Sequence, residues 1–118
     1  MRMKTVDETN FEREVLEADI PVLVYFWGKG CGPWEIMEAT LEEVAVALEG
    51  KVKVVKMNVD ENPDHAEEFT TGFTPTLAFF MGGELIRFEE PVIRDSRDDP
   101  KTEILNLTSR KLKYLGLA

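Results

Sequence analysis

The chain has 118 residues and a mass of 13.5 kDa, with 43% hydrophobic and 31% charged residues, which is typical of one domain over 1–118. Its 14 Lys and Arg against 23 Asp and Glu give a net charge of −9, which argues against binding to nucleic acid or to an anionic membrane, since both need clustered cations. The single cysteine, Cys31, excludes an intramolecular disulfide and a cysteine-rich metal site.

The N-terminal segment lacks the cationic, apolar and small-residue pattern of a secretory signal. The longest apolar stretches fall well short of the roughly 20 residues that a membrane-spanning helix needs. We therefore expect a cytoplasmic protein that does not bind a membrane.

The first part of the chain predicts a short strand, a helix and a buried strand. Lys4–Val6 is expected to form the short strand, and Thr9 or Asn10 to cap the helix. Val22–Trp27 is an unbroken run of aliphatic and aromatic residues, which is typical of a strand covered on both faces. A glycine-rich turn then spans 28–32.

A long amphipathic helix is predicted after this turn. Pro33 suits the first residue of a helix, and apolar residues follow it at helical spacing. They are Trp34, Met37, Leu41, Val44, Ala45 and Leu48. Gly50 is expected to cap the C-terminus of the helix.

The second half of the chain predicts a strand, a short helix, a hairpin and a final helix. The strand covers Val52–Val59, the short helix ends at Phe69, and the hairpin joins Thr76–Met81 to Leu85–Glu89 through Gly82-Gly83. After a charged loop at 94–99, apolar residues mark one face of the final helix. They are Ile104, Leu107, Leu112 and Leu115. The order βαβαβαββα predicts an α/β domain with a mixed sheet of four to five strands, flanked by helices on both faces.

Cys31 lies where the buried strand gives way to the next helix. The free N–H groups and partial positive charge of a helix N-terminus stabilise a thiolate and should bring its pKa below about 8.5. Lys29 would assist this ionisation, whereas Glu35 would oppose it. A small buried apolar residue is the alternative role, but the context Gly30-Cys31-Gly32-Pro33 favours an exposed nucleophile.

Four stretches of the sequence resemble the thioredoxin family, from about residue 5 to about residue 90. They are Val22–Trp27 with Cys31-Gly32-Pro33, Val55–Asp60 with Asn62-Pro63, Phe69 with Thr74-Pro75-Thr76, and Gly82-Gly83-Glu84. The resemblance implies the thioredoxin fold.

The resemblance also implies a mechanism. Thioredoxins reduce disulfides with the turn Cys-Gly-Pro-Cys, in which the first cysteine attacks and the second resolves the mixed disulfide. By this match Cys31 is the catalytic nucleophile, and Gly30, Gly32, Pro33 and Trp34 form the active-site turn. Because Trp34 stands at the resolving position, the chain is expected to be at most a monothiol disulfide oxidoreductase and not a dithiol thioredoxin.

Two further departures from the family pattern accompany the loss of the second cysteine. Tyr25 stands where the family has a buried aspartate that assists the resolving step, and Gly30 replaces an aromatic residue. Lys56 keeps the type of the lysine that pairs with that aspartate, so the resemblance implies a lysine that has lost its partner.

The resemblance further implies a substrate groove formed by Trp27, Phe73, Thr74 and Pro75. Pro75 matches the cis-proline of the family, beside which the backbone of Thr74 would pair with an extended peptide. Trp27 is otherwise expected to be a packing residue. Trp34 either covers the core beside Cys31 or forms an exposed platform next to the thiol.

Two functions follow from these expectations. The first is a redox protein of cell redox homeostasis, in which Cys31 forms mixed disulfides with a protein or with a low-molecular-weight thiol such as glutathione. The alternative is a non-catalytic peptide-binding or chaperone-like module that uses the Trp34/Thr74/Pro75 groove. No metal or cofactor is expected, since His65 is the only histidine. The chain is expected to be a monomer that can form a Cys31-linked dimer.

Overall fold

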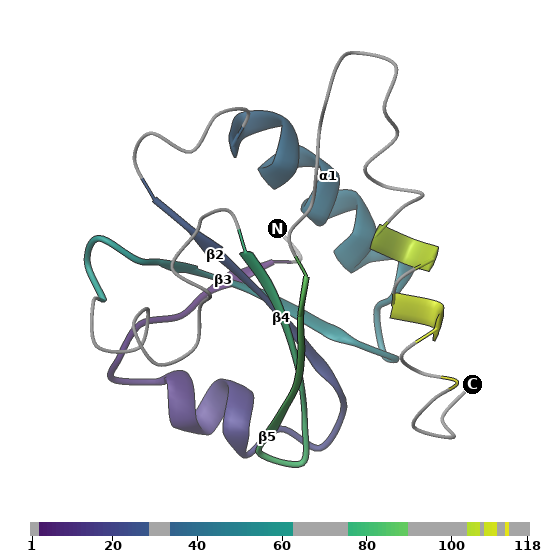
Figure 1. The fold of residues 1–118 in the computed structure, drawn as a ribbon, viewed down its shortest axis with the longest axis horizontal. Helices are drawn as coiled ribbons and strands as arrows, with labels where there is room; N and C mark the ends of the chain where they lie inside the picture. Colours follow the sequence, from purple (N-terminus) through teal and green to yellow (C-terminus); the bar gives the residue numbers. More distant parts are fainter. Residues whose placement is uncertain are drawn as a thin grey trace.

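In the computed structural model, a five-stranded sheet forms the centre of the molecule (Figure 1). The structure describes residues 3–28, 34–62, 76–89, 104–106, 108–110 and 113. The strand order across the sheet is β1-β3-β2-β4-β5. The strands are β1 (Lys4–Thr5), β2 (Val22–Trp27), β3 (Lys53–Asn58), β4 (Thr76–Met81) and β5 (Glu84–Glu89).

The sheet is mixed, as the sequence predicts. β1 and β2 both pair with β3 in parallel, whereas β4 runs antiparallel to β2 and β5 antiparallel to β4. The strand predicted over Val52–Val59 is shorter by one residue at each end, and β1 by one residue at its end. The carboxyl ends of β2 and β3 therefore lie at the same edge of the sheet, where β4 begins.

Two helices cover opposite faces of this sheet (Figure 1). The first, η1 (Glu12–Leu16), is one π-helical turn closed by the N–H of Glu17, which donates to the Glu12 carbonyl at 2.9 Å. The second, α1 (Trp34–Ala47), is a regular α-helix. This arrangement confirms the α/β class and the helices on both faces.

The predicted cap of the first helix is wrong. Phe11 occupies the N-cap position and makes no side-chain capping hydrogen bond, while the N–H groups of Phe11 and Glu14 donate to the carbonyls of Asp7 and Asn10. Asn10 instead accepts a hydrogen bond from the Asp7 N–H at 2.8 Å, and the Asp7 carboxylate accepts one from the Thr9 N–H at 2.8 Å. These polar side chains satisfy the turn that precedes the helix, so they are not available to its first turn.

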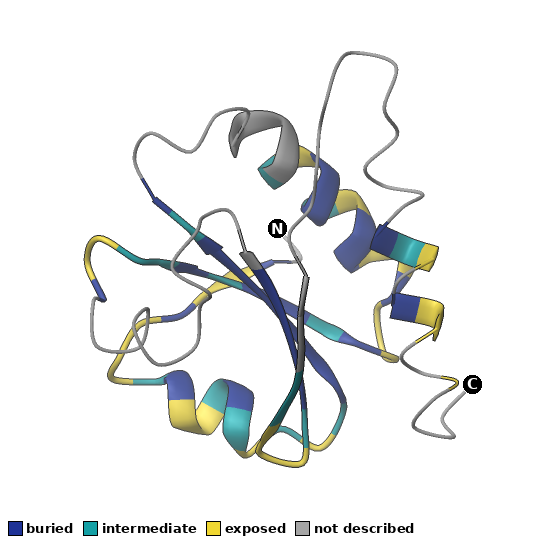
Figure 2. Cartoon of the chain, viewed as in Figure 1, coloured by how far each residue is buried: buried dark blue, intermediate teal, exposed yellow. Residues whose placement is uncertain are grey.

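Alternate residues of β2 supply two separate cores, one on each face of the sheet (Figure 2). Leu23 and Tyr25 pack with α1, whereas the other set packs with η1. That set is Val22, Val24 and Phe26. Because neighbouring side chains of a strand point to opposite faces, a strand buried on both faces must be apolar throughout, and this confirms the prediction for 22–27.

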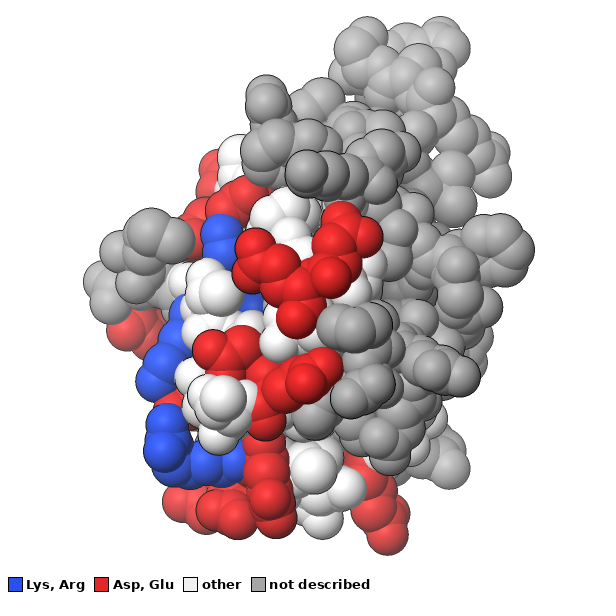
Figure 3. Space-filling view, turned by 90° about the vertical axis from the view of Figure 1, so that its left-hand side faces the viewer, with Lys and Arg blue, Asp and Glu red and all other residues white. Residues whose placement is uncertain are grey.

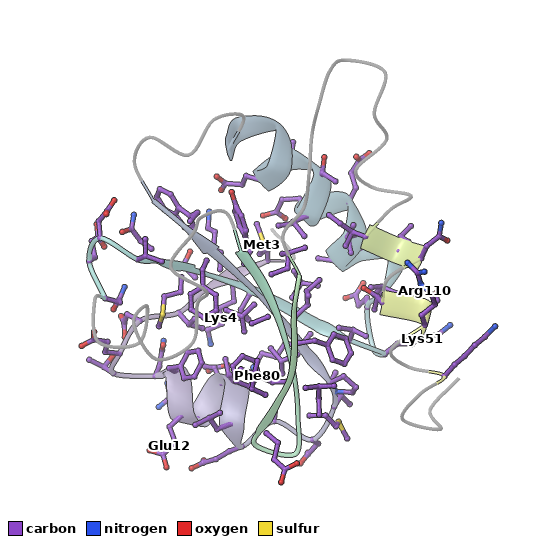
Figure 4. The ribbon with its side chains drawn as sticks, viewed as in Figure 1. Met3, Lys4, Glu12, Lys51, Phe80 and Arg110 are labelled. Atoms are coloured by element: carbon purple, nitrogen blue, oxygen red, sulfur yellow. The ribbon has the colours of Figure 1, made fainter. Side chains whose placement is uncertain are left out.

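An aromatic pair fixes η1 against the sheet. The rings of Phe11 and Phe80 meet edge to face at a centroid distance of 5.8 Å and an interplanar angle of 80°. Phe80 lies beside η1, whereas the side chain of Glu12 points away from the sheet (Figure 4).

Glycines form both turns at the predicted positions. Gly82 and Gly83 have φ of +61° and +83°, which matches a two-residue hairpin with both central residues in the left-handed region. Gly50, with φ of +85°, ends the turn after α1, where the Val52 N–H donates to the Leu48 carbonyl at 3.0 Å. The hairpin prediction is confirmed, whereas α1 ends at Ala47, so Gly50 belongs to the turn after the helix and is not its cap.

The final helix is confirmed for the part that the structure describes. Residues 104–106 and 108–110 are helical, and Ile104 is buried in the core that includes α1. The predictions for Leu107, Leu112 and Leu115, for the short helix ending at Phe69 and for the loop at 94–99 lie outside the described residues. Among the described helices, none is long and apolar enough to cross a membrane.

Candidate functional site

The edge of the sheet where β2 and β3 end is the position predicted for the active-site turn. At this edge the Val59 N–H donates to the Trp27 carbonyl at 2.8 Å, and Thr76, the first residue of β4, lies opposite Phe26. Gly28 precedes the predicted turn, and Thr76 follows the predicted proline segment. Both segments therefore join the sheet at the same edge.

The central residues of the predicted site lie outside the described residues. They are Gly30, Cys31, Gly32, Pro33, Phe73, Thr74 and Pro75, together with the side chain of Trp34. The described part of α1 begins at Trp34. The roles of these residues stay predictions.

Gly28 allows the end of β2 to lie very close to the segment that follows β3. A Cβ atom on Gly28 would come within 2.8 Å of Cγ2 of Val59 and within 3.2 Å of a carboxylate oxygen of Asp60. At a distance below 3.0 Å the Val59 side chain would have to shift, so a Cβ atom at position 28 carries a steric cost that glycine avoids. The close approach also places the Asp60 carboxylate beside the start of the predicted turn.

The surface at this edge is acidic. The Glu8 N–H donates to Oδ1 of Asn62 at 3.0 Å, which places Asp7 and Glu8 near Asp60 and Glu61. All four acidic residues are exposed, and acidic side chains extend over much of the described surface in Figure 3. Negative charge at this edge opposes the ionisation of a neighbouring thiol, so it counteracts the effect of the helix N-terminus.

Tyr25 contributes a phenol where the thioredoxin pattern has a carboxylate. Its side chain is 1% exposed, its hydroxyl oxygen is buried, and it lies opposite Lys56 in the pairing of β2 with β3. A tyrosine is neutral at pH 7, so Tyr25 supplies no negative charge to Lys56.

The implied loss of the partner of Lys56 is wrong. The Lys56 ammonium donates to Oε1 of Glu38, from the second turn of α1. The side chains are 12% and 27% exposed, so the ion pair is largely shielded from solvent. The acid that neutralises this lysine therefore comes from the helix and not from β2.

The sequence carries a signal for this ion pair. Glu38 lies three residues before Leu41 and four after Trp34, so a helix places it beside the apolar stripe. Lys56 is a cation between Val55 and Met57, which are both buried. An acid beside the apolar stripe of the helix and a cation on the strand that the helix covers predict an ion pair. An isolated buried charge would be very costly.

Trp27 is partly buried and packs against the core that includes Tyr25 and Leu41. This contact agrees with the packing role expected for it. Its part in a substrate groove stays a prediction.

Among the described residues, no three His, Cys, Asp or Glu side chains gather into a group that could hold a metal ion.

Comparison with known proteins identifies the family. The thioredoxin family model matches residues 2–99. The chain is 46% identical over 79 residues to a thioredoxin of Rickettsia felis, in an alignment that covers 67% of this chain and 75% of that protein. It is 44% identical over 81 residues to thioredoxin 1 of a Nostoc species, covering 69% and 76%.

A longer alignment extends the similarity over most of the chain. A thioredoxin of Haemophilus influenzae is 33% identical over 107 residues, which covers 91% of this chain and 94% of that protein. These similarities support a thioredoxin-type redox function. The chain belongs to the thioredoxin family.

Proposed function

We propose that this chain is a monothiol member of its family that forms mixed disulfides through Cys31. The Cys31 thiolate would attack one sulfur of a partner disulfide, forming a new S–S bond while the other sulfur leaves as a thiolate and takes up a proton. A second thiol, from glutathione or from another cysteine of the partner, would then attack the mixed disulfide and release the Cys31 thiolate.

The observation that carries this proposal is the count of one cysteine in 118 residues. Resolution within the chain requires a second thiol, and the matching position is Trp34, the first residue of α1. Tyr25 supports the same conclusion, because it cannot serve as the carboxylate base of a resolving step.

The proposed site combines the turn and the neighbouring proline segment. Gly30, Gly32 and Pro33 would hold Cys31 before the helix, and Phe73, Thr74 and Pro75 would line a groove for an extended peptide with Trp27 and Trp34. The common edge of the sheet from which Gly28 and Thr76 depart supports this combination.

We expect the protein to act in the cytoplasm as a monomer on protein partners. Oxidation in the absence of a partner would give a Cys31-linked dimer, which a non-reducing gel separates from the monomer. Glutathione is the expected low-molecular-weight thiol of the resolving step.

The second candidate is a binding module without redox turnover. The acidic edge favours it, because negative charge opposes thiolate formation, and the missing resolving cysteine favours it too, because the chain cannot complete a dithiol cycle alone. Such a module would hold a peptide in the Trp34/Thr74/Pro75 groove, and its binding would be unchanged in Cys31→Ser.

The pH dependence of Cys31 alkylation tests the proposal. We expect a pKa below the ordinary thiol value of about 8.5. We also expect little catalysis of insulin reduction with dithiothreitol, and a Cys31-dependent increase when glutathione is supplied. A thiol pKa at or above 8.5, together with identical peptide binding by Cys31→Ser, would favour the binding module.

A further inference from the structure

The Glu38–Lys56 ion pair is the feature of the described residues that the proposed function does not use. Lys56 lies opposite Tyr25 of β2 and Thr5 of β1, and neither side chain carries a charge at pH 7. Within the part of the chain that the structure describes, Glu38 is the only acidic side chain paired with Lys56. The Glu38 carboxylate therefore neutralises the shielded charge of Lys56, which its strand neighbours Tyr25 and Thr5 do not.

The covalent chain limits how far Glu38 can lie from Cys31. Glu38 lies four residues after Trp34, about 6 Å along the axis of α1. Cys31 precedes Trp34 by three residues, which span at most about 11 Å. The Cα atoms of Cys31 and Glu38 are thus no more than about 17 Å apart, a distance at which an uncompensated, poorly solvated charge still acts on a thiol.

We propose that Glu38 is a positioning residue for the thiol chemistry: by neutralising Lys56 it sets the fraction of Cys31 that is present as thiolate. Loss of Glu38 alone leaves the Lys56 cation, which stabilises a thiolate. Loss of Lys56 alone leaves the Glu38 carboxylate, which destabilises one. This inference rests on the proposed role of Cys31. It assigns the neutralisation of Lys56 to Glu38 of α1, since Tyr25 of β2 carries no negative charge at pH 7.

Other titratable groups surround the pair. Glu42 follows one turn later on α1, Asp60 follows β3, and Tyr25 lies on β2. Lys29 and Glu35 flank Cys31 in the sequence. Since these groups are the same in every variant below, their effects cancel when variants are compared.

The test measures the rate of Cys31 alkylation by iodoacetamide against pH in the full chain. We expect Glu38→Gln to lower the thiol pKa by about half a unit, a roughly threefold rise in thiolate at a pH below the pKa. Lys56→Gln should raise it by a similar amount. The double variant, which carries no charge at either position, should return to within about 0.2 units of the parent.

Two further variants separate charge from packing. Lys56→Arg keeps the cation and should leave the thiol pKa unchanged, although the shape of the side chain differs. Glu43→Gln removes an exposed acid from α1 and should shift the pKa much less than Glu38→Gln. Circular dichroism shows whether each variant is folded.

Single variants that shift the thiol pKa in the same direction, or a Glu38→Gln shift no larger than that of Glu43→Gln, would overturn the inference. Opposed shifts in a chain that forms no mixed disulfide would leave the inference standing while the monothiol function fails. If the chain forms mixed disulfides but the two variants do not shift the thiol pKa in opposite directions, the monothiol function stands and the inference about Glu38 fails.

Discussion

The Lys56 ammonium of β3 is neutralised by the Glu38 carboxylate of α1, while on the opposite face two other lysines reach Glu14 of η1. Lys4 and Lys53 lie 2.8 and 2.6 Å from the Glu14 oxygens. Each covering helix thus presents a glutamate to lysines of the sheet. Removing Glu38 or Lys56 leaves a largely shielded charge without its partner, whereas Lys4 is about half exposed.

Glu14 should make stability depend on pH. The hydrogen bond from Lys4, then that from Lys53, lowers the pKa of Glu14 from 4.5 to about 2. A carboxyl with a depressed folded-state pKa stabilises the fold fully above its unfolded value of 4.5, and this contribution is lost as the pH falls towards 2. Glu14→Gln should therefore lower the free energy of unfolding by about 1–2 kcal/mol at pH 7 and by much less near pH 2.

Urea denaturation at the two pH values measures this difference. Glu12→Gln is the matched control, since Glu12 lies in the same helix and is exposed; it should change stability by less than about 0.5 kcal/mol. A Glu14→Gln effect of equal size at both pH values would contradict the role of ionisation.

Gly28→Ala should destabilise the protein by about 1–2 kcal/mol, because the new methyl group would lie 2.8 Å from Cγ2 of Val59. Val59→Ala removes that methyl group. In a double-mutant cycle measured by urea denaturation, the two substitutions together should cost less than the sum of the single costs, by at least about 0.5 kcal/mol. If the two losses of stability are additive, the contact between a Cβ atom at position 28 and the Val59 methyl group is not the cause of the destabilisation.

Leu41→Ala should cost about 2–5 kcal/mol, because the side chain is 0% exposed in the core between α1 and the sheet. Val46→Ala on the same helix is the control. Its side chain is 55% exposed, so we expect a change within about 0.5 kcal/mol. Thermal or urea unfolding checks both, and equal costs would contradict the orientation of α1.

Trp34→Cys should create dithiol activity. The substitution supplies a second thiol at the start of α1, where the family pattern has its resolving cysteine. We expect insulin reduction with dithiothreitol to rise by about tenfold or more, because the mixed disulfide could then resolve within the chain. Trp34→Ser removes the indole without adding a thiol and should show no gain. A gain of the same size in Trp34→Ser would attribute the effect to steric access instead.

Much of the fold could be predicted because its signals are local. An unbroken apolar strand such as 22–27 has to be covered on both faces, and Gly82-Gly83 fits few turns other than a tight hairpin. The first helix was harder, because polar side chains near a helix start can serve the preceding turn as well as the first helical turn. Asn10 bonds to Asp7 in this way.

The site could be predicted only in outline. The single cysteine and Trp34 follow directly from the sequence. The pairing of Glu38 with Lys56 depends on how α1 lies across β3, a relationship between residues 18 positions apart. The approach of Asp60 to Gly28 likewise depends on packing between segments far apart in the chain.

The most direct test of the central claim is mass spectrometry of the reduced chain after mixing with two copies of a peptide joined by one intermolecular disulfide. The attack releases the second peptide as a free thiol, which is removed before the adduct is followed. We predict an adduct of one peptide per chain that then persists without added thiol, is released by glutathione and is absent in Cys31→Ser. No adduct above the Cys31→Ser control, or an adduct that still resolves after the peptide thiol has been removed, would contradict the account.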